Sequence, residues 1–197
     1  MSGAPFQNQP IASGGINSQA SEANHPGITR IVSSAGGDSG DTIGSFVSAI
    51  CLNGTEVFEA IFKIPALTNT TTRMGFHDST NQSDAANGCY IEIASTGVAT
   101  GKTATSSNRS STGTTYTIST NTWYNAKVTV NSAGTLITFA IYDMSGTLLW
   151  SDTLATNIPL AVNLHIALNI TTSVGGVVDL MYLDYMSARL SGLVRGV

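Results

Sequence analysis

Residues 123–154 read WYNAKVTVNSAGTLITFAIYDMSGTLLWSDTL, and this stretch decides the fold class. It holds three segments in which apolar and polar residues alternate, separated by the turn-like sequences NSAG and MSG. A period of two places successive side chains on opposite faces of a strand, and Gly, Asn and Ser between such runs are typical of turns. The stretch therefore predicts three consecutive antiparallel strands.

The same alternation continues outward from this stretch. In VFEAIFKI, residues 57–64, the alternate apolar residues share one face with Phe58. In TRMGFHDST, residues 72–80, Phe76 falls inside and His77 outside. Similar runs recur up to the final VVDLMYLDYMSARL, and no segment shows the period of an amphipathic helix. We therefore predict an all-β protein of about ten to twelve short strands, an antiparallel β-sandwich or jelly roll.

The start of the chain differs from the rest. Residues 1–25 are rich in Gly, Ser, Asn and Gln and show no periodicity, which is typical of an extended arm. We predict a flexible N-terminal arm over 1–25 and one sandwich domain over 26–197. The isolated Phe6 and Ile11 are the candidate residues for anchoring the arm to a partner.

Composition limits the partners. The chain of 197 residues has eight Lys and Arg, a net charge of -4 and only 10% charged residues, where soluble domains usually have about 25%. Ser and Thr, 23 and 26 residues, take their place. So few cations predict no nucleic-acid or membrane partner. A weakly charged surface and a mean hydropathy of +0.14 predict a homo-oligomer.

Targeting and redox signals are sparse. The N-terminal MSGAPFQNQP has neither a basic nor an apolar region, so no signal peptide is predicted. Cys51 and Cys89 would pair in an extracellular protein, or remain as two buried thiols in strands. Both alternatives stay open from the sequence.

Two motifs carry a resemblance to a known family. The run from Trp123 through the final Leu-Asp-Tyr segment, together with EANHPGITRIVSS at residues 22–34, resembles the concanavalin A-like jelly-roll domains of tailed-phage virion surface proteins. The resemblance covers roughly residues 22–190. It implies a virion component made in the host cytoplasm, usually trimeric, in contact with other capsid or tail proteins. We expect a capsid decoration protein held by its arm, or alternatively a tail-fibre or lectin-like module that binds host surface glycans.

Ser39 raises the question of catalysis, because GGDSGD at residues 36–41 contains the Gly-Asp-Ser-Gly run of trypsin-like proteases. A serine nucleophile needs a histidine base within hydrogen-bond reach. None of the three histidines lies in the protease motif, and Ser39 precedes nearly every predicted strand. We interpret the segment as a Gly-rich turn.

Glycoside hydrolysis is the other enzyme class to consider, since the concanavalin A-like sandwich also occurs in glucanases. It needs two carboxylates facing one another across a cleft. Asp179 and Asp184 are five residues apart, and Glu56 and Glu59 three apart, so each pair falls on opposite faces of a regular strand. The sequence predicts no catalytic residue, no cofactor and no enzyme.

An oxygen-rich loop follows one predicted strand. FHDSTNQSDAANG brings His77, Asp78 and Asp84 close in sequence, as in some Ca²⁺ loops. The spacing matches no EF-hand, and Asn, Asp and Ser are common in ordinary turns. We predict no metal site.

Aromatic residues are the best candidates for a binding site, because a sugar ring packs on an aromatic face beside hydrogen-bonding side chains. Trp123 and Tyr124 fall on opposite faces, so at most one belongs to the core. Trp150 shares a face with Leu148, which favours burial. We name Trp123 and Tyr124 as the predicted glycan contacts.

Overall fold

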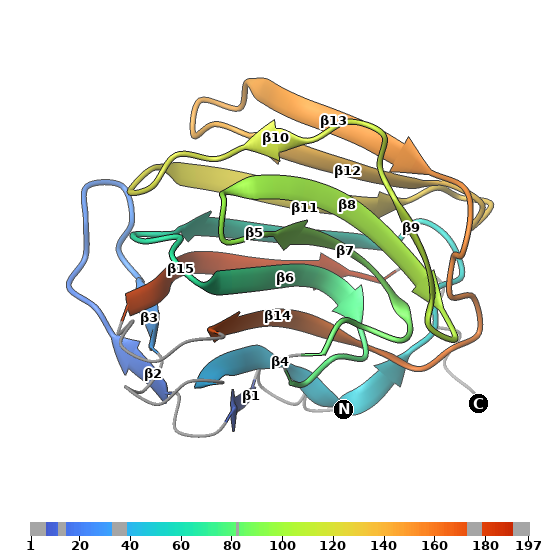
Figure 1. Ribbon diagram of the computed structural model, residues 1–197, viewed down its shortest axis with the longest axis horizontal. Helices are drawn as coiled ribbons and strands as arrows, with labels where there is room; N and C mark the ends of the chain where they lie inside the picture. Colours follow the sequence, from blue (N-terminus) through green and yellow to red (C-terminus); the bar gives the residue numbers. More distant parts are fainter. Residues whose placement is uncertain (1–6, 12–14, 33–38, 82, 173–178, 191–197) are drawn as a thin grey trace.

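The protein is a two-layered β-sandwich (Figure 1). The computed structural model describes residues 7–11, 15–32, 39–81, 83–172 and 179–190. These residues form strands, bends and turns and contain no helix, so none of the described chain is a helix that could cross a membrane. The predicted fold class is confirmed.

Sheet A lies nearer the viewer in Figure 1, and its strands are antiparallel. Its order is β1 (Gln7–Ile11), β4 (Ser39–Ile50), β14 (Leu164–Thr172), β6 (Thr70–His77), β7 (Gly88–Ile93), β8 (Val98–Thr105) and β10 (Tyr116–Thr117), with β9 (Asn108–Ser111) also paired to β8.

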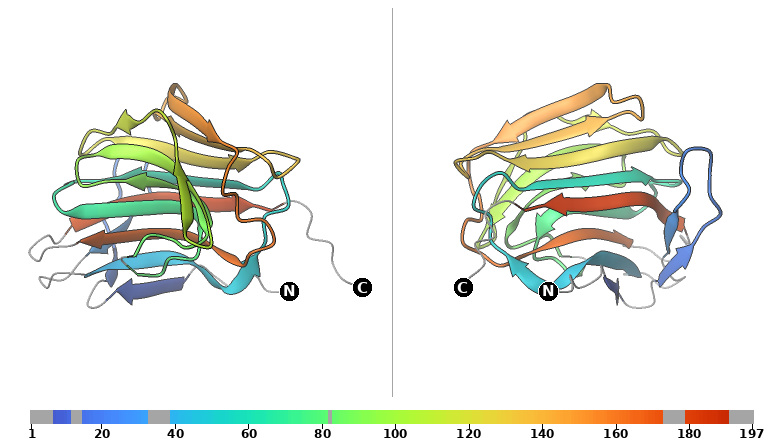
Figure 2. Two further views of the ribbon diagram at one scale, coloured as in Figure 1. Left: turned by 45° about the vertical axis from the view of Figure 1, so that its right-hand side comes forward. Right: turned by 180° about the vertical axis from the view of Figure 1, so that it is seen from behind.

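Sheet B is the second layer, seen from behind in the right-hand view of Figure 2. Its order is β13 (Leu148–Leu154), β12 (Ile137–Tyr142), β11 (Trp123–Val130), β5 (Val57–Lys63), β15 (Asp179–Arg189), β3 (Thr29–Val32) and β2 (Gly15–Ser18). Residues 123–154 supply three adjacent strands, β11, β12 and β13, as predicted.

The core lies between the two sheets, where the period of two places it. Phe58 and Phe62 of β5 and Met74 and Phe76 of β6 are all fully buried. The rings of Phe58 and Phe76 meet edge to face across the two layers, with centroids 6.2 Å apart. Burial of such aromatic and aliphatic side chains is the main favourable term in folding.

The segment predicted as an arm contributes edge strands. Gln7–Ile11 pairs with β4 along one edge of sheet A, and Gly15–Ser18 pairs with β3 at one edge of sheet B. An edge strand is held by backbone hydrogen bonds on one side, so it needs no alternating side-chain pattern. The structure therefore differs from an arm without packed elements, and the division at residue 25 stays a prediction.

Candidate functional site

One line of side chains crosses the outer face of sheet B over five strands. Its members stand directly opposite one another in the pairings of β13 with β12, β12 with β11, β11 with β5 and β5 with β15. Directly opposite residues project to the same face of a sheet. This outer row consists of Leu148, Tyr142, Asn125, Ile61 and Tyr185.

A β-bulge lies beside each end of the outer row. The register of β13 shifts so that Leu149 is the extra residue, and that of β15 shifts so that Asp184 is extra. A bulge re-aims the side chains beside it. Leu148 is therefore 52% exposed although Trp150, two residues on, is 7% exposed, and Tyr185 is 48% exposed. The burial expected for Trp150 is confirmed, but Leu148 does not share its environment.

The middle of the outer row is polar. Asn125 donates a hydrogen bond from its side-chain nitrogen to Oε1 of Glu59, at 2.6 Å, which fixes the amide in place. Tyr142 beside it is half-buried. The row spans four strand spacings, about 19 Å. Aromatic rings at intervals with polar side chains between them form the kind of surface that packs against sugar rings.

A hook formed by residues 19–28 closes over the same face of sheet B. Glu22 and His25 exchange two backbone hydrogen bonds of 3.1 and 2.9 Å, and the Pro26-Gly27 that follows forms a turn. The imidazole of His25 stacks on the indole of Trp123, with centroids 4.0 Å apart and planes 14° apart. The indole nitrogen donates to Glu22 at 3.0 Å. Trp123 is thus the anchor of the hook.

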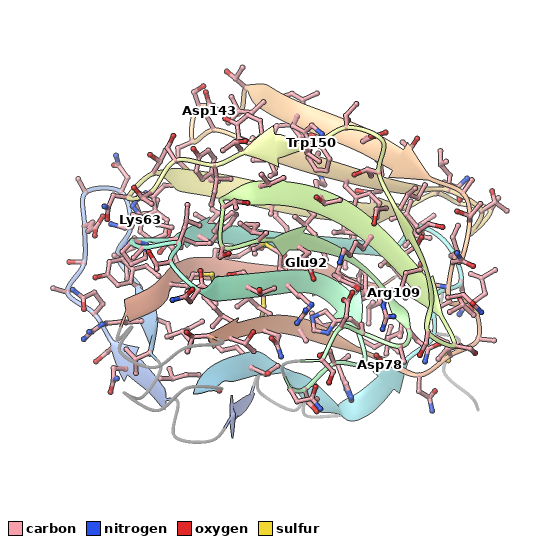
Figure 3. The ribbon with its side chains drawn as sticks, in the orientation of Figure 1. Lys63, Asp78, Glu92, Arg109, Asp143 and Trp150 are labelled. Carbon is pink, nitrogen blue, oxygen red and sulfur yellow. The ribbon has the colours of Figure 1, made fainter. Side chains whose placement is uncertain are left out.

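Lys63 lies at the centre of the contacts below the hook (Figure 3). Its ammonium lies 5.0 Å from the ring centre of Trp123 and 4.8 Å from that of Tyr182, and 2.5 Å from the carboxylate of Glu22. Its hydrogen bond, followed by that of Trp123, lowers the pKa of Glu22. One ammonium thus makes both the cation–π contacts and the ion pair, which ties the hook to β5 and β11.

Trp123→Ala is expected to lower the free energy of unfolding by about 2 kcal/mol, since stacking and packing on a partly exposed ring are lost. The amide protons of Glu22 and His25, which pair across the hook, should exchange faster with solvent. Urea unfolding and hydrogen exchange measure the two effects. Tyr185→Ala, at a more exposed ring of the same face, is the control and should cost less than about 1 kcal/mol.

The other predicted site residues fall in different places. Tyr124 is 4% exposed, packs near Phe62 in the core and accepts a 2.9 Å hydrogen bond from the amide of Ser119. Its ring is a core side chain and offers no surface to a sugar, which corrects that prediction. Phe6 lies outside the described residues. Ile11 ends β1, opposite Gly40, and its side chain is not described.

The β6–β7 loop, described at residues 78–81 and 83–87, packs over one end of the outer face of sheet A (Figure 1). Asp84 in this loop lies within 3.3 Å of Arg73 and of Arg109 and within 3.1 Å of Lys102. Arg73 and Lys102 also contact Glu92, at 2.9 and 2.7 Å. Figure 3 shows Glu92 and Arg109 on the viewer's side of the sheet. Two carboxylates and three cations thus form one charge cluster under the loop.

The charge cluster favours the ionised form of Asp84. Burial alone would raise the pKa of Asp84, but the hydrogen bond from Tyr90 and the contacts with Lys102 and Arg73 outweigh it and lower the pKa. Burial, together with Asp84, raises the pKa of the Tyr90 hydroxyl. His77, predicted to be outside, does lie on this face but is fully buried, because the loop covers it.

The remaining candidates have structural roles in the described chain. The carboxylate of Asp78 accepts hydrogen bonds from the amides of Ala86 and Asn87 at 2.9 and 3.0 Å, which holds the base of the loop. Among the described residues, no three His, Cys, Asp or Glu side chains are grouped to hold a metal ion. Ser39 opens β4. Cys51 and Cys89 are both free thiols, and Cys89 is fully buried.

Comparison with solved structures relates this sandwich to three kinds of protein. It is similar to SO2946, a protein of unknown function from Shewanella oneidensis MR-1, with a TM-score of 0.78 and 23% identity over 98% of this chain and 82% of that one. It is similar to the Bacillus licheniformis β-glucanase (TM-score 0.56, 13% identity, 93% and 97% of the two chains). It is also similar to the Emp47p carbohydrate recognition domain (TM-score 0.53, 12% identity, 93% and 96%).

At these identities the similar structures establish a shared jelly-roll fold, the concanavalin A-like sandwich, and nothing finer. None of these three structures is described as a virion protein, so the virion role stays a prediction. A search of curated proteins found no match to this chain. The family model described as "SO2946-like, C-terminal domain" matches residues 24–184, from the hook to the bulge of β15. The chain therefore belongs to the SO2946-like C-terminal domain family.

Proposed function

We propose that this protein is a glycan-binding module whose binding surface is the outer row of sheet B. One observation carries the proposal: Tyr142 and Tyr185 are held on the same face at three strand spacings, about 14 Å, with the fixed amide of Asn125 between them. This spacing allows one extended saccharide to contact both rings. The half-exposed Tyr185 has ring surface available for such a contact.

The fold supports the same class of ligand. One similar structure is a carbohydrate recognition domain and another is a β-glucanase, so the sandwich is used by other proteins for both binding and cleaving sugars. Fold likeness does not choose between these two activities. The choice has to come from the carboxylates of this chain.

The charge cluster of sheet A favours binding without cleavage. Glycoside hydrolysis uses one carboxyl group as a general acid, and that group needs a raised pKa. The pKa of Asp84 is lowered, and both Asp84 and Glu92 are engaged by Arg73 and Lys102. Asp84 of the β6–β7 loop also packs directly on Arg73, Lys102 and Arg109 of this face. We therefore propose a module without hydrolase activity.

The double variant Tyr142→Ala/Tyr185→Ala tests the proposal. A glycan array identifies a binding saccharide, and isothermal titration calorimetry then compares its affinity for the variant and the native protein. We expect a loss of about 30-fold, because two aromatic contacts at the centre of the surface carry roughly 2 kcal/mol.

Leu160→Ala is the matched control, since Leu160 is an exposed apolar residue, 46% exposed, outside the outer row. It should leave the affinity unchanged. A double variant that folds and binds like the native protein would refute the location of the site. Absence of binding to every saccharide on the array would refute the function.

A second candidate function is attachment to a virion, as the sequence resemblance predicts. Met144 and Leu148 are 46% and 52% exposed at the β12–β13 turn and favour contact with another protein. The homotrimer expected with this role is tested by light scattering on the full chain. A mass of three chains would support the assembly, and a monomer at all concentrations would count against it.

A further inference from the structure

The positively charged side chains of the described chain differ in whether they pair with carboxylates. On sheet A, Arg73, Lys102 and Arg109 all contact the carboxylates of the charge cluster. On sheet B, Lys63 is bound to Glu22 under the hook. These cations are neutralised within the protein and are not available to a ligand.

Lys127 is different. It lies on β11, two residues beyond Asn125, on the same outward face. Glu59 stands directly opposite it on β5, but that carboxylate accepts its hydrogen bond from Asn125. Among the described residues Lys127 makes no ion pair and no side-chain hydrogen bond.

Lys127 is half-buried on the outer face of sheet B. Apart from Glu59, the residues that stand in line with it across the sheet are small: Ala140 on β12, Ser151 on β13 and Ser187, two strands away on β15. Their short side chains leave room on the outer face beside the lysine side chain. Arg189, two residues beyond Ser187, is an exposed cation on the same face, again with no ion pair within the described chain.

The position of Lys127 relates it to the outer row. Two residues along an antiparallel strand cover about 7 Å, a distance that an extended lysine side chain can span. Its ammonium can therefore reach the edge of a saccharide that lies across Tyr142 and Asn125. A neutral sugar gains little from a full positive charge there, whereas a carboxylate or sulfate gains a charge-assisted hydrogen bond.

We infer that the glycan bound by the outer row is anionic, a polymer of uronic acids or sulfated sugars, and that Lys127 recognises its acidic group. This inference rests on the proposed function above. A single-stranded nucleic acid also combines bases that stack with negative charge. The net charge of -4 and the commitment of most cations elsewhere disfavour it.

Polygalacturonate and its fully methyl-esterified form provide the test, because they share a backbone and differ in charge. We expect the native protein to bind the acid form about fivefold to tenfold more tightly, as one charge-assisted hydrogen bond requires. Lys127→Gln should remove that difference by weakening binding of the acid form only. Lys127→Arg, the matched control, should retain it. The preference for the acid form should also decrease as the salt concentration is raised.

The outcomes separate the inference from the proposed function. Equal affinity for the two polymers, or a preference that survives in folded Lys127→Gln, overturns the inference and leaves glycan binding intact. If the protein binds neither polymer and no saccharide of the array, both the inference and the proposed function are overturned. Competition by an oligothymidine at similar concentration overturns the inference, because the surface would then recognise nucleic acid.

Discussion

Acidification from pH 6.5 to pH 4 is expected to lower the free energy of unfolding by about 3 kcal/mol through His77. Burial under the β6–β7 loop, and then the nearby charge of Arg73, lower the pKa of this imidazole from 6.5 to about 4. The unfolded chain takes up a proton between these two values and the folded protein does not. Stability therefore falls as the pH falls across this window, and this contribution is constant above it.

Urea unfolding at several pH values measures this effect. In His77→Gln the slope of unfolding free energy against pH between 6.5 and 4 should be reduced by the contribution of one proton. His165→Gln is the control, because His165 lies directly opposite His77 on β14 and is less buried. An unchanged slope in folded His77→Gln would show that this imidazole is not held neutral.

Gly75→Ala is expected to cost roughly 4 kcal/mol or more, the largest effect of a single substitution that we predict. Gly75 lies in the middle of β6 with a φ of +150°, which side chains rarely adopt. A Cβ there would lie 2.5 Å from the carbonyl oxygen of Cys89 and 2.8 Å from the Cα of Tyr90. Both atoms belong to the backbone of β7, which cannot retreat without breaking its pairing with β6.

Gly113→Ala is the matched control, because a Cβ at Gly113 would have no atom within 4 Å. It should change stability by less than about 0.5 kcal/mol. Thermal and urea unfolding compare the two variants. A Gly75→Ala protein as stable as Gly113→Ala would contradict the close packing of β6 on β7.

The fold class could be predicted because alternation along a strand is a local property. Phe58 and Phe76 follow the period of two, and both lie in the core as expected. The edge strands β1 and β2 could not be predicted, because backbone pairing at an edge leaves no side-chain pattern. The burial of His77 could not be predicted either, because the loop that covers it has an ordinary turn composition.

The candidate site depends on information that one sequence does not contain. Asn125, Tyr142 and Tyr185 come together through the register of four neighbouring strands, and register is set by pairing over the whole sheet. Tyr185 faces outward because Asp184 is an extra residue in a bulge. Alternation alone correctly separated Trp123 from Tyr124, but it did not predict that the hook would use Trp123 as its anchor.

The central claim is that saccharides bind the outer row of sheet B. Two-dimensional ¹H–¹⁵N NMR of the labelled protein, titrated with a short oligosaccharide of the polymer it binds, tests this claim most directly. We expect shift changes concentrated at the amides around Asn125, Tyr142 and Tyr185. Changes confined to β6, β7, β8 and the β6–β7 loop, with the outer row unaffected, would contradict it.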